Sequence, residues 1–380
     1  MAVGRSAPRT EPPDAKGGGP VTTMNRRTYL KANVALLGAA FAERCTRAAA
    51  VTGAAATLEH PSAADLLSYV DPQFRAGLEP LLKAPVEINA KTLPKLRTLR
   101  FPGTQDPAAL PKWERRLVSG AAGSPDVPVY LINAQAPGAN KPAILHMHGG
   151  GYVLGAAEPS VSRLQPIATE LDCVVVTVDY RLAPETPFPG SVQDNYAALK
   201  WLHDNAASLG VDAGRVALMG ESAGGGHAAM LAIAARDKGE VPLVAQVLIY
   251  PMLDDRTVTR HVPEYIGQYL WTRSANRFGW SSFLGKPPGS ESVPYGAVPA
   301  RVKNLAGLPP AFIGVGAIDL FVDEDIEYAR RLVDAGVATE LVVVPGAYHA
   351  FEYLCPDAPL SRRFVSTWMD MLRRYLRAPA

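Results

Sequence analysis

Apolar and polar positions change their spacing at about residue 114, and from there short apolar runs alternate with amphipathic stretches. The runs CVVVTV and AQVLIY are apolar throughout, which is typical of strands covered on both faces. Eight runs of this kind predict strands at Arg115–Val118, Val129–Asn133, Ala143–Met147, Cys173–Val178, Arg215–Met219, Ala245–Tyr250, Ala311–Val315 and Glu340–Val344.

Helical patterns lie between several of these strands. They cover Ser191–Asn205, Ala223–Lys238 and Asp323–Ala335. Alternation of strand and helix predicts an α/β fold with a mostly parallel, eight-stranded sheet and helices on both of its faces. Ahead of the sheet, Ala63–Lys83 predicts one or two short helices.

Residues 255–305 interrupt the alternation. They are rich in Trp, Tyr, Arg and Pro and contain no clear strand, which predicts an insertion over the top of the sheet. Trp271 and Trp280 in this insertion either line a substrate entrance or hold the insertion onto the core, and we favour packing.

Composition and charge narrow the class of protein. With 380 residues, 48% of them hydrophobic, the chain can bury one large core. The formal charge is only +2, and outside residues 1–50 the chain is slightly acidic, so we expect no nucleic-acid partner. The sequence contains no apolar run of the ~18 residues that a membrane helix needs, and we expect no transmembrane segment.

The basic residues gather in the first 50 positions, which hold eight Lys or Arg against three acidic residues. Arg26 and Arg27 precede a mildly apolar stretch, 32–42, and a run of small residues that ends at Ala50. This order resembles a bacterial twin-arginine signal behind a disordered extension rich in Pro and Gly. It predicts a periplasmic or secreted protein, with the cytoplasm as the alternative, and cleavage after Ala50 or, second, after Ala42.

The cysteines do not suggest a disulfide framework. Cys45 leaves with the predicted signal, which leaves Cys173 and Cys355. The predicted fold places these two at opposite ends of the sheet, ~20 Å apart, whereas the Cα atoms of a disulfide lie within ~7 Å. We expect both thiols to be free.

The strongest chemical signal is the pentapeptide Gly220-Glu221-Ser222-Ala223-Gly224, which follows a predicted strand and opens a predicted helix. This is the G-x-S-x-G nucleophile elbow in the context that it requires. There the serine is held exposed in a strained turn above the sheet. We therefore predict that Ser222 is a nucleophile.

A serine nucleophile needs a base, and the base needs an orienting acid, in the chain order Ser, acid, His. Of the seven histidines, His261 and His349 come late enough, and only His349 directly follows a predicted strand. Asp319 follows the strand before it. Asp323 and Asp325 lie where a helix should begin, so we expect them to cap that helix or to face solvent. Asp319 and His349 are thus the predicted acid and base.

Three consecutive glycines follow the strand that ends at Met147, in the stretch His148-Gly149-Gly150-Gly151. Such a run implies backbone that approaches something closely. At this place its amides, together with the amide of Ala223, are suited to binding the oxyanion of a tetrahedral intermediate. We expect His148 to brace this loop rather than to act as a base.

Four motifs together resemble one family. HGGG at 148–151, DYRLAPE at 179–185, GESAGG at 220–225 and YPMLDD at 250–255 are similar to those of the bacterial hormone-sensitive-lipase-like esterases. The resemblance implies an α/β-hydrolase core and an oxyanion hole formed by Gly150, Gly151 and Ala223. It also implies a helical cap, made here from 51–110 and from the insertion at about 255–305, on a core that spans 111–380.

The function expected from these residues is that of a serine carboxylesterase. It would cleave short- to medium-chain esters through an acyl-enzyme, with a small-molecule ester as its partner and with no metal or other cofactor. The motifs leave alternatives open, namely an amidase, a peptidase or a lactonase that uses the same triad, and a non-catalytic ligand receptor on the same fold. They also leave the oligomeric state open.

Overall fold

A computed structural model describes residues 62–83, 86–98 and 110–377, so the predicted signal lies outside the described residues. The chain forms an eight-stranded sheet in the order β1-β2-β4-β3-β5-β6-β7-β8. Strand β2 pairs antiparallel with β1 and with β4, and all other neighbours are parallel. The predicted mostly parallel sheet is confirmed. Its strands are β1 (Trp113–Val118), β2 (Val127–Ile132), β3 (Lys141–Met147), β4 (Val174–Val178), β5 (Val211–Glu221), β6 (Ala245–Ile249), β7 (Ala311–Gly316) and β8 (Thr339–Val344).

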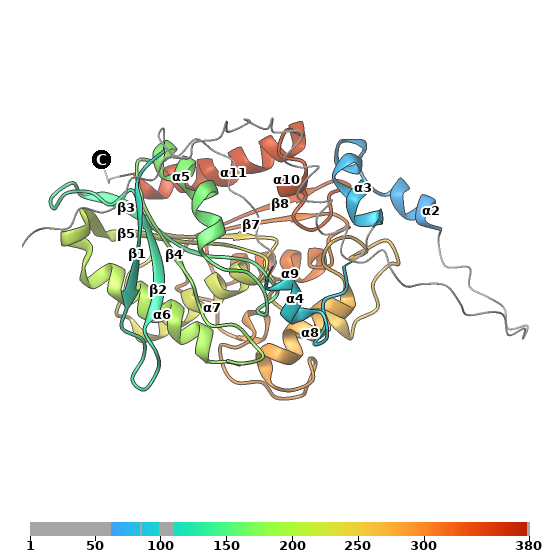
Figure 1. Ribbon diagram of the computed structural model, residues 1–380, viewed down its shortest axis with the longest axis horizontal. Helices are drawn as coiled ribbons and strands as arrows, with labels where there is room; N and C mark the ends of the chain where they lie inside the picture. The colour runs from blue at the N-terminus through green and yellow to red at the C-terminus, as the bar shows by residue number, and fades with distance from the viewer. Residues whose placement is uncertain (1–61, 84–85, 99–109, 378–380) are drawn as a thin grey trace, which may run out of the picture.

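Helices cover both faces of the sheet, as Figure 1 shows. Alternate strand residues point into two separate cores. Val175 belongs to the core under α5 and α11, whereas Val174 and Val176 belong to the core under α6, α7 and α9. Burial on both faces explains why these strands read as continuous apolar runs. The helices are α5 (Val161–Glu170), α6 (Gly190–Asp204), α7 (Ala223–Lys238), α9 (Val322–Asp334) and α11 (Pro359–Leu376).

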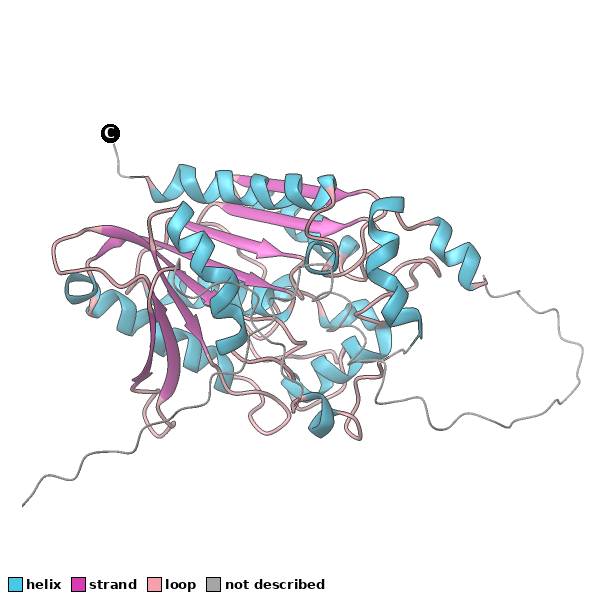
Figure 2. Ribbon diagram, turned by 45° about the horizontal axis from the view of Figure 1, so that its top comes forward, coloured by secondary structure: helices cyan, strands magenta, loops and turns pink. Residues whose placement is uncertain are grey.

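The remaining helices gather at one end of the sheet, on the side to which the strand arrows of β7 and β8 point in Figure 2. In parallel α/β sheets this carboxyl end is where active sites lie. The helices are α2 (Ala63–Ser68), α3 (Arg75–Lys83), α4 (Leu93–Leu96), α8 (Arg273–Leu284) and α10 (Phe351–Leu354). Short 3-10 turns lie at Pro72–Phe74, Glu158–Ser160, Ala206–Leu209, Asp255–Val258 and Pro299–Arg301. None of the described helices has the length and apolar character that crossing a membrane requires.

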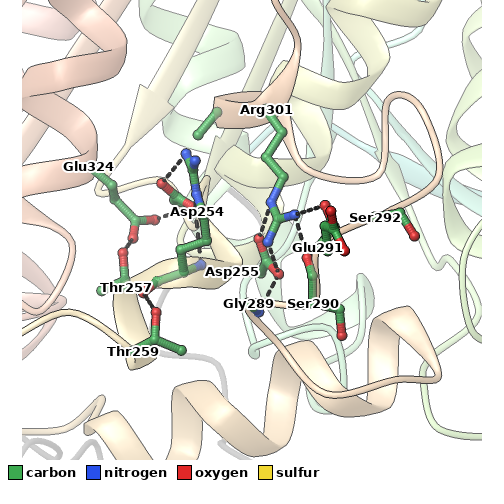
Figure 3. Close-up of polar contacts among 12 residues, drawn as sticks. Asp254, Asp255, Thr257, Thr259, Gly289, Ser290, Glu291, Ser292, Arg301 and Glu324 are labelled. Carbon is green, nitrogen blue, oxygen red and sulfur yellow. Dashed lines mark hydrogen bonds and ion pairs between the residues drawn. The ribbon is translucent and has the colours of Figure 1, made fainter.

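The segment predicted as an insertion, 255–305, contains a buried ion pair between its two ends, drawn in Figure 3. Asp255 is fully buried and accepts two hydrogen bonds from Arg301, at 2.7 and 2.8 Å, and one from the amide of Gly289. Arg301 also donates to the carbonyl of Ser290 at 2.7 Å. These contacts join both ends of the insertion to each other.

A second carboxyl fixes the start of the insertion. Glu324, on α9, accepts hydrogen bonds from the amides of Leu253 and Asp254, at 2.6 and 3.1 Å, and from the hydroxyl of Thr257. Burial raises the pKa of Glu324 well above its ordinary value, and the nearby Asp254 raises it further. The three donors give both oxygens of this buried carboxyl a hydrogen-bond partner.

Arg301→Met should destabilise the protein, because it leaves Asp255 buried without its ion-pair partner. Breaking a buried pair in this way costs about 3–5 kcal/mol, which denaturant unfolding of the two proteins would measure. Arg330→Met is the matched control, since Arg330 is exposed on α9 and pairs with Glu327 and Asp334 at the surface. It should leave the unfolding midpoint nearly unchanged. Equal shifts for the two variants would contradict a structural role of the Asp255 pair.

Candidate active site

The serine selected from the sequence lies at a sharp turn between β5 and α7. Ser222 has φ 57° and ψ −122°, a backbone conformation that is costly for a residue with a side chain. The amide of Ser222 donates to the carbonyl of Ile249 at 2.8 Å, and the carbonyl of Ser222 accepts from the amides of Gly226 and Met252, each at 3.0 Å. The turn is therefore held from both sides. The strain is therefore maintained by the sheet and the helix together.

The elbow needs a glycine after the serine because of a close backbone approach. A methyl group on Gly224 would lie 2.0 Å from the carbonyl oxygen of Met147, at the end of β3. Strand β3 is the neighbour of β5 in the sheet. The glycine lets the start of α7 lie directly against the loop that follows β3.

Three side chains from three different loops meet at this turn. His349 Nε2 lies 2.9 Å from Ser222 Oγ, and His349 Nδ1 lies 2.8 Å from Asp319 Oδ2. A carboxylate only accepts hydrogen bonds, which assigns the imidazole proton to Nδ1 and leaves Nε2 free to accept the serine proton. All three side chains are buried, so Ser222 is covered and not exposed as the elbow motif predicted. The structure thus brings the predicted nucleophile, base and acid into one hydrogen-bonded chain.

Aromatic rings hold the imidazole in place. The rings of Tyr250 and Phe321 meet the His349 ring edge-on, with centroids 4.8 and 5.3 Å away, and Trp271 lies 6.4 Å from it. Asp319 is fixed in turn, since its other oxygen accepts from the Phe321 amide at 3.0 Å. Such packing exposes little of the imidazole to water and limits its rotation.

The glycine loop after β3 lies beside the serine. A methyl group on Gly149 would lie 3.4 Å from Ser222 Cβ. Gly150 has φ +128°, and a methyl group there would lie 2.1 Å from the carbonyl of Leu154, so only glycine fits. Within the described chain, the amides of Gly150 and Gly151 donate to no protein acceptor. The amide of Ala223 begins α7 and has no partner inside that helix. These three amides are available to a ligand.

The contacts of His148 fix the glycine loop in place. Its ring stacks on Tyr180 at a centroid distance of 4.2 Å, its Nδ1 donates to the carbonyl of Gly149, and its own carbonyl accepts from the Tyr180 hydroxyl. Burial lowers the pKa of His148 to about 4, so the ring is neutral at pH 7. These contacts agree with our interpretation of this histidine from the sequence.

A buried ionic cluster beneath the serine was not predicted. Glu221 lies 2.8 Å from Arg163 and 3.1 Å from His146, and His146 in turn bonds Thr177 at 2.8 Å. Burial raises the pKa of Glu221, but Arg163 and His146 outweigh this effect and hold it well below its ordinary value. Glu221 directly precedes Ser222, so the cluster fixes the elbow from below. Its position in the elbow motif was the only signal in the sequence.

The two other acids near Asp319 behave differently from each other. Asp323 is exposed on the first turn of α9, as expected. Asp325 is completely buried, and neither of its oxygens has a hydrogen-bond partner among the described residues. Burial raises its pKa well above the ordinary value, and Glu324 and Asp319 raise it further. Our expectation that Asp325 caps the helix or faces solvent is therefore wrong, because α9 turns this residue inward.

The other sequence predictions for individual residues can now be placed. Cys173 and Cys355 are both free thiols, as expected. Trp280 is fully buried against Tyr152, which fits packing, whereas Trp271 packs and also lies beside His349. Among the described residues, no group of three or more His, Cys, Asp or Glu side chains is arranged to hold a metal ion.

The chain is similar to proteins of known activity and structure. Residues 144–353 match the family model for the alpha/beta hydrolase fold. The carboxylesterase NlhH of Mycobacterium tuberculosis is 35% identical over 292 residues, which cover 75% of this chain and 88% of that protein. The ethyl acetate hydrolase of Pseudomonas putida is 31% identical over 62% of this chain and 79% of its own length.

Solved structures agree with the sequence relatives. A bacterial heroin esterase superposes with a TM-score of 0.73 at 35% identity, covering 82% of this chain and 99% of that one. The esterase LipW of Mycobacterium marinum gives 0.69 at 32% identity, covering 82% and 98%. The chain belongs to the α/β-hydrolase fold, and within it to the bacterial hormone-sensitive-lipase-like esterase family.

Proposed function

We propose that this carboxylic ester hydrolase uses Ser222 as nucleophile, His349 as general base and Asp319 as the acid that orients the base. Ester hydrolysis itself follows from relatives that are a carboxylesterase, an ethyl acetate hydrolase and an arylesterase. The observation that carries the residue assignment is the hydrogen-bonded chain from Ser222 Oγ to His349 to Asp319, at 2.9 and 2.8 Å.

In the proposed acylation, Ser222 Oγ attacks the ester carbonyl while His349 Nε2 takes the hydroxyl proton. The negative charge that forms on the carbonyl oxygen is bound by the free amides of Gly150, Gly151 and Ala223. Collapse of the tetrahedral intermediate breaks the bond to the alcohol oxygen, to which His349 returns the proton. Water then repeats these steps on the acyl-enzyme and releases the acid. Asp319 stabilises the imidazolium in both halves.

We expect a preference for short to medium acyl chains. The insertion lies against the loops that carry Asp319 and His349. The amide of Gly267 donates to the carbonyl of Ile318 at 3.0 Å, and the ring of Tyr269 packs on that of Tyr348. The N-terminal segment lies there too, through the amide of Asp71, which donates to Gly346 at 3.1 Å. These contacts support a cap composed of 51–110 and 255–305 over a core of 111–380. Such a cap limits the room for a long acyl chain.

The test is a series of p-nitrophenyl esters of increasing acyl length, run beside matched p-nitroanilides and a set of lactones. We expect kcat/KM to be highest for acyl chains of two to about eight carbons, and the anilides to react far more slowly. Faster turnover of anilides or lactones would indicate an amidase or a lactonase on the same triad. Equal or faster turnover of emulsified long-chain triglycerides would contradict the closed cap.

For localisation we propose export by the twin-arginine route, which carries folded proteins. Residues 24–50 support it by their order of an arginine pair, a weakly apolar stretch and small residues. Changing both Arg26 and Arg27 to Lys should retain the active, uncut enzyme in the cytoplasm of a bacterium that has this route, as cell fractionation would show. Changing Arg44 and Arg47 to Lys is the control and should leave export intact. Wild-type activity confined to the cytoplasm, with the segment still attached, would refute the proposal.

A further inference from the structure

Trp271, in the insertion, lies against the proposed oxyanion loop. A methyl group on Gly151 would lie 1.9 Å from Cη2 of Trp271 and 2.5 Å from Cζ2. The benzo edge of the indole therefore touches the Cα of Gly151. The same indole lies 6.4 Å from the His349 ring, centroid to centroid. One apolar side chain thus borders both the oxyanion loop and the base.

The indole is held firmly in this position. Its Nε1 donates to the side-chain oxygen of Asn276 at 3.2 Å, and Asn276 is fully buried on α8. Helix α8 is itself seated on the loop, because a methyl group on Gly279 would lie 2.6 Å from the carbonyl of Gly151. Only 5% of Trp271 is exposed. A side chain fixed at both ends acts as a rigid wall and does not yield to a bulky substrate.

The chemistry of the intermediate decides which part of the substrate meets this wall. The oxyanion must point to the loop amides, and the leaving oxygen must point to His349 Nε2, from which it receives its proton. The acyl chain takes the remaining direction, away from the imidazole. A side chain that borders both the loop and the imidazole consequently lies beside the leaving alcohol.

We propose that Trp271 determines which alcohols this esterase can release, by excluding branching at the carbon that bears the ester oxygen. The alcohol part of an ester lies along the indole when it is linear or flat. A branch at the carbon that bears the ester oxygen collides with the edge of the indole. The inference rests on the proposed function, since it uses the proposed roles of Gly151 and His349. It makes Trp271 a specificity-determining residue with no part in proton transfer.

The test compares two pairs of isomeric esters. 3-Pentyl acetate and n-pentyl acetate differ only by branching on the alcohol side, and ethyl 2-ethylbutyrate and ethyl hexanoate differ only by branching on the acyl side. Trp271→Ala should raise the ratio of kcat/KM for 3-pentyl over n-pentyl acetate by about tenfold or more, the usual effect of a methylene-sized change in an apolar site. The acyl-side ratio should stay within about twofold of the wild-type value. Trp271→Phe should fall between wild type and Trp271→Ala.

Both ratios are measured on one preparation, so they do not depend on the folded fraction. Trp280→Phe is the matched control, because Trp280 lies on α8 with its indole fully buried against Tyr152. It should leave both ratios unchanged. An unchanged alcohol-side ratio in Trp271→Ala, a change in the acyl-side ratio instead, or an equal loss for all four esters would overturn the proposal. Failure of the proposed function would show separately, as ester turnover that survives Ser222→Ala.

Discussion

Ser222→Ala should abolish ester hydrolysis, with a loss of about 10⁶-fold in kcat, as is found when a triad serine is removed. The reason is that neither His349 nor the oxyanion amides can form an acyl-enzyme without the serine oxygen. Only one hydroxyl is lost, and alanine keeps the same strained backbone, so the melting temperature should change little. Steady-state kinetics and thermal unfolding of the two proteins give the measurement.

A covalent probe provides the control for this variant. An aryl phosphonate should label the wild-type protein once, with the modified peptide containing Ser222, and should not label Ser222→Ala. A variant that kept a tenth of wild-type activity, or was still labelled at the same rate, would remove Ser222 from the mechanism.

Asp319→Asn should lower kcat by about 10⁴-fold, the loss expected when an amide replaces a triad carboxylate. An asparagine can present its NH₂ group to His349 Nδ1, which moves the imidazole proton to Nε2 and prevents it from accepting the serine proton. The amide also fails to stabilise the imidazolium. Measured kcat/KM for a short-chain ester would show the loss.

Asp323→Asn is the matched control, since Asp323 is exposed four residues further along the chain and touches none of the triad. It should retain nearly full activity. If Asp323→Asn were the inactive variant and Asp319→Asn the active one, our assignment of the orienting acid would be wrong by one helical turn.

Local sequence patterns predicted most of the core. All eight strands and the helices α6, α7 and α9 were predicted, and the short helices expected in 63–83 are α2 and α3. The central strands were found because strands that are buried on both faces carry continuous apolar runs, whereas β1 is mostly exposed. Helices α5, α8 and α11 were not assigned. Pro166 lies within α5, where a proline interrupts the helical pattern of the sequence, and the helix packs on the sheet through Leu164 and Ile167.

The sequence by itself selected Ser222, His349, Asp319 and the glycine loop as parts of the proposed site, because each follows a strand and carries its own local signature. Only the tertiary structure decided what surrounds them. Arg163 reaches Glu221 from a distant helix, Asp325 turns inward, and Trp271 comes to lie on Gly151. These contacts join residues far apart in the chain, and no periodicity or motif encodes such pairs. Packing of the insertion and the helices against the sheet brings them together.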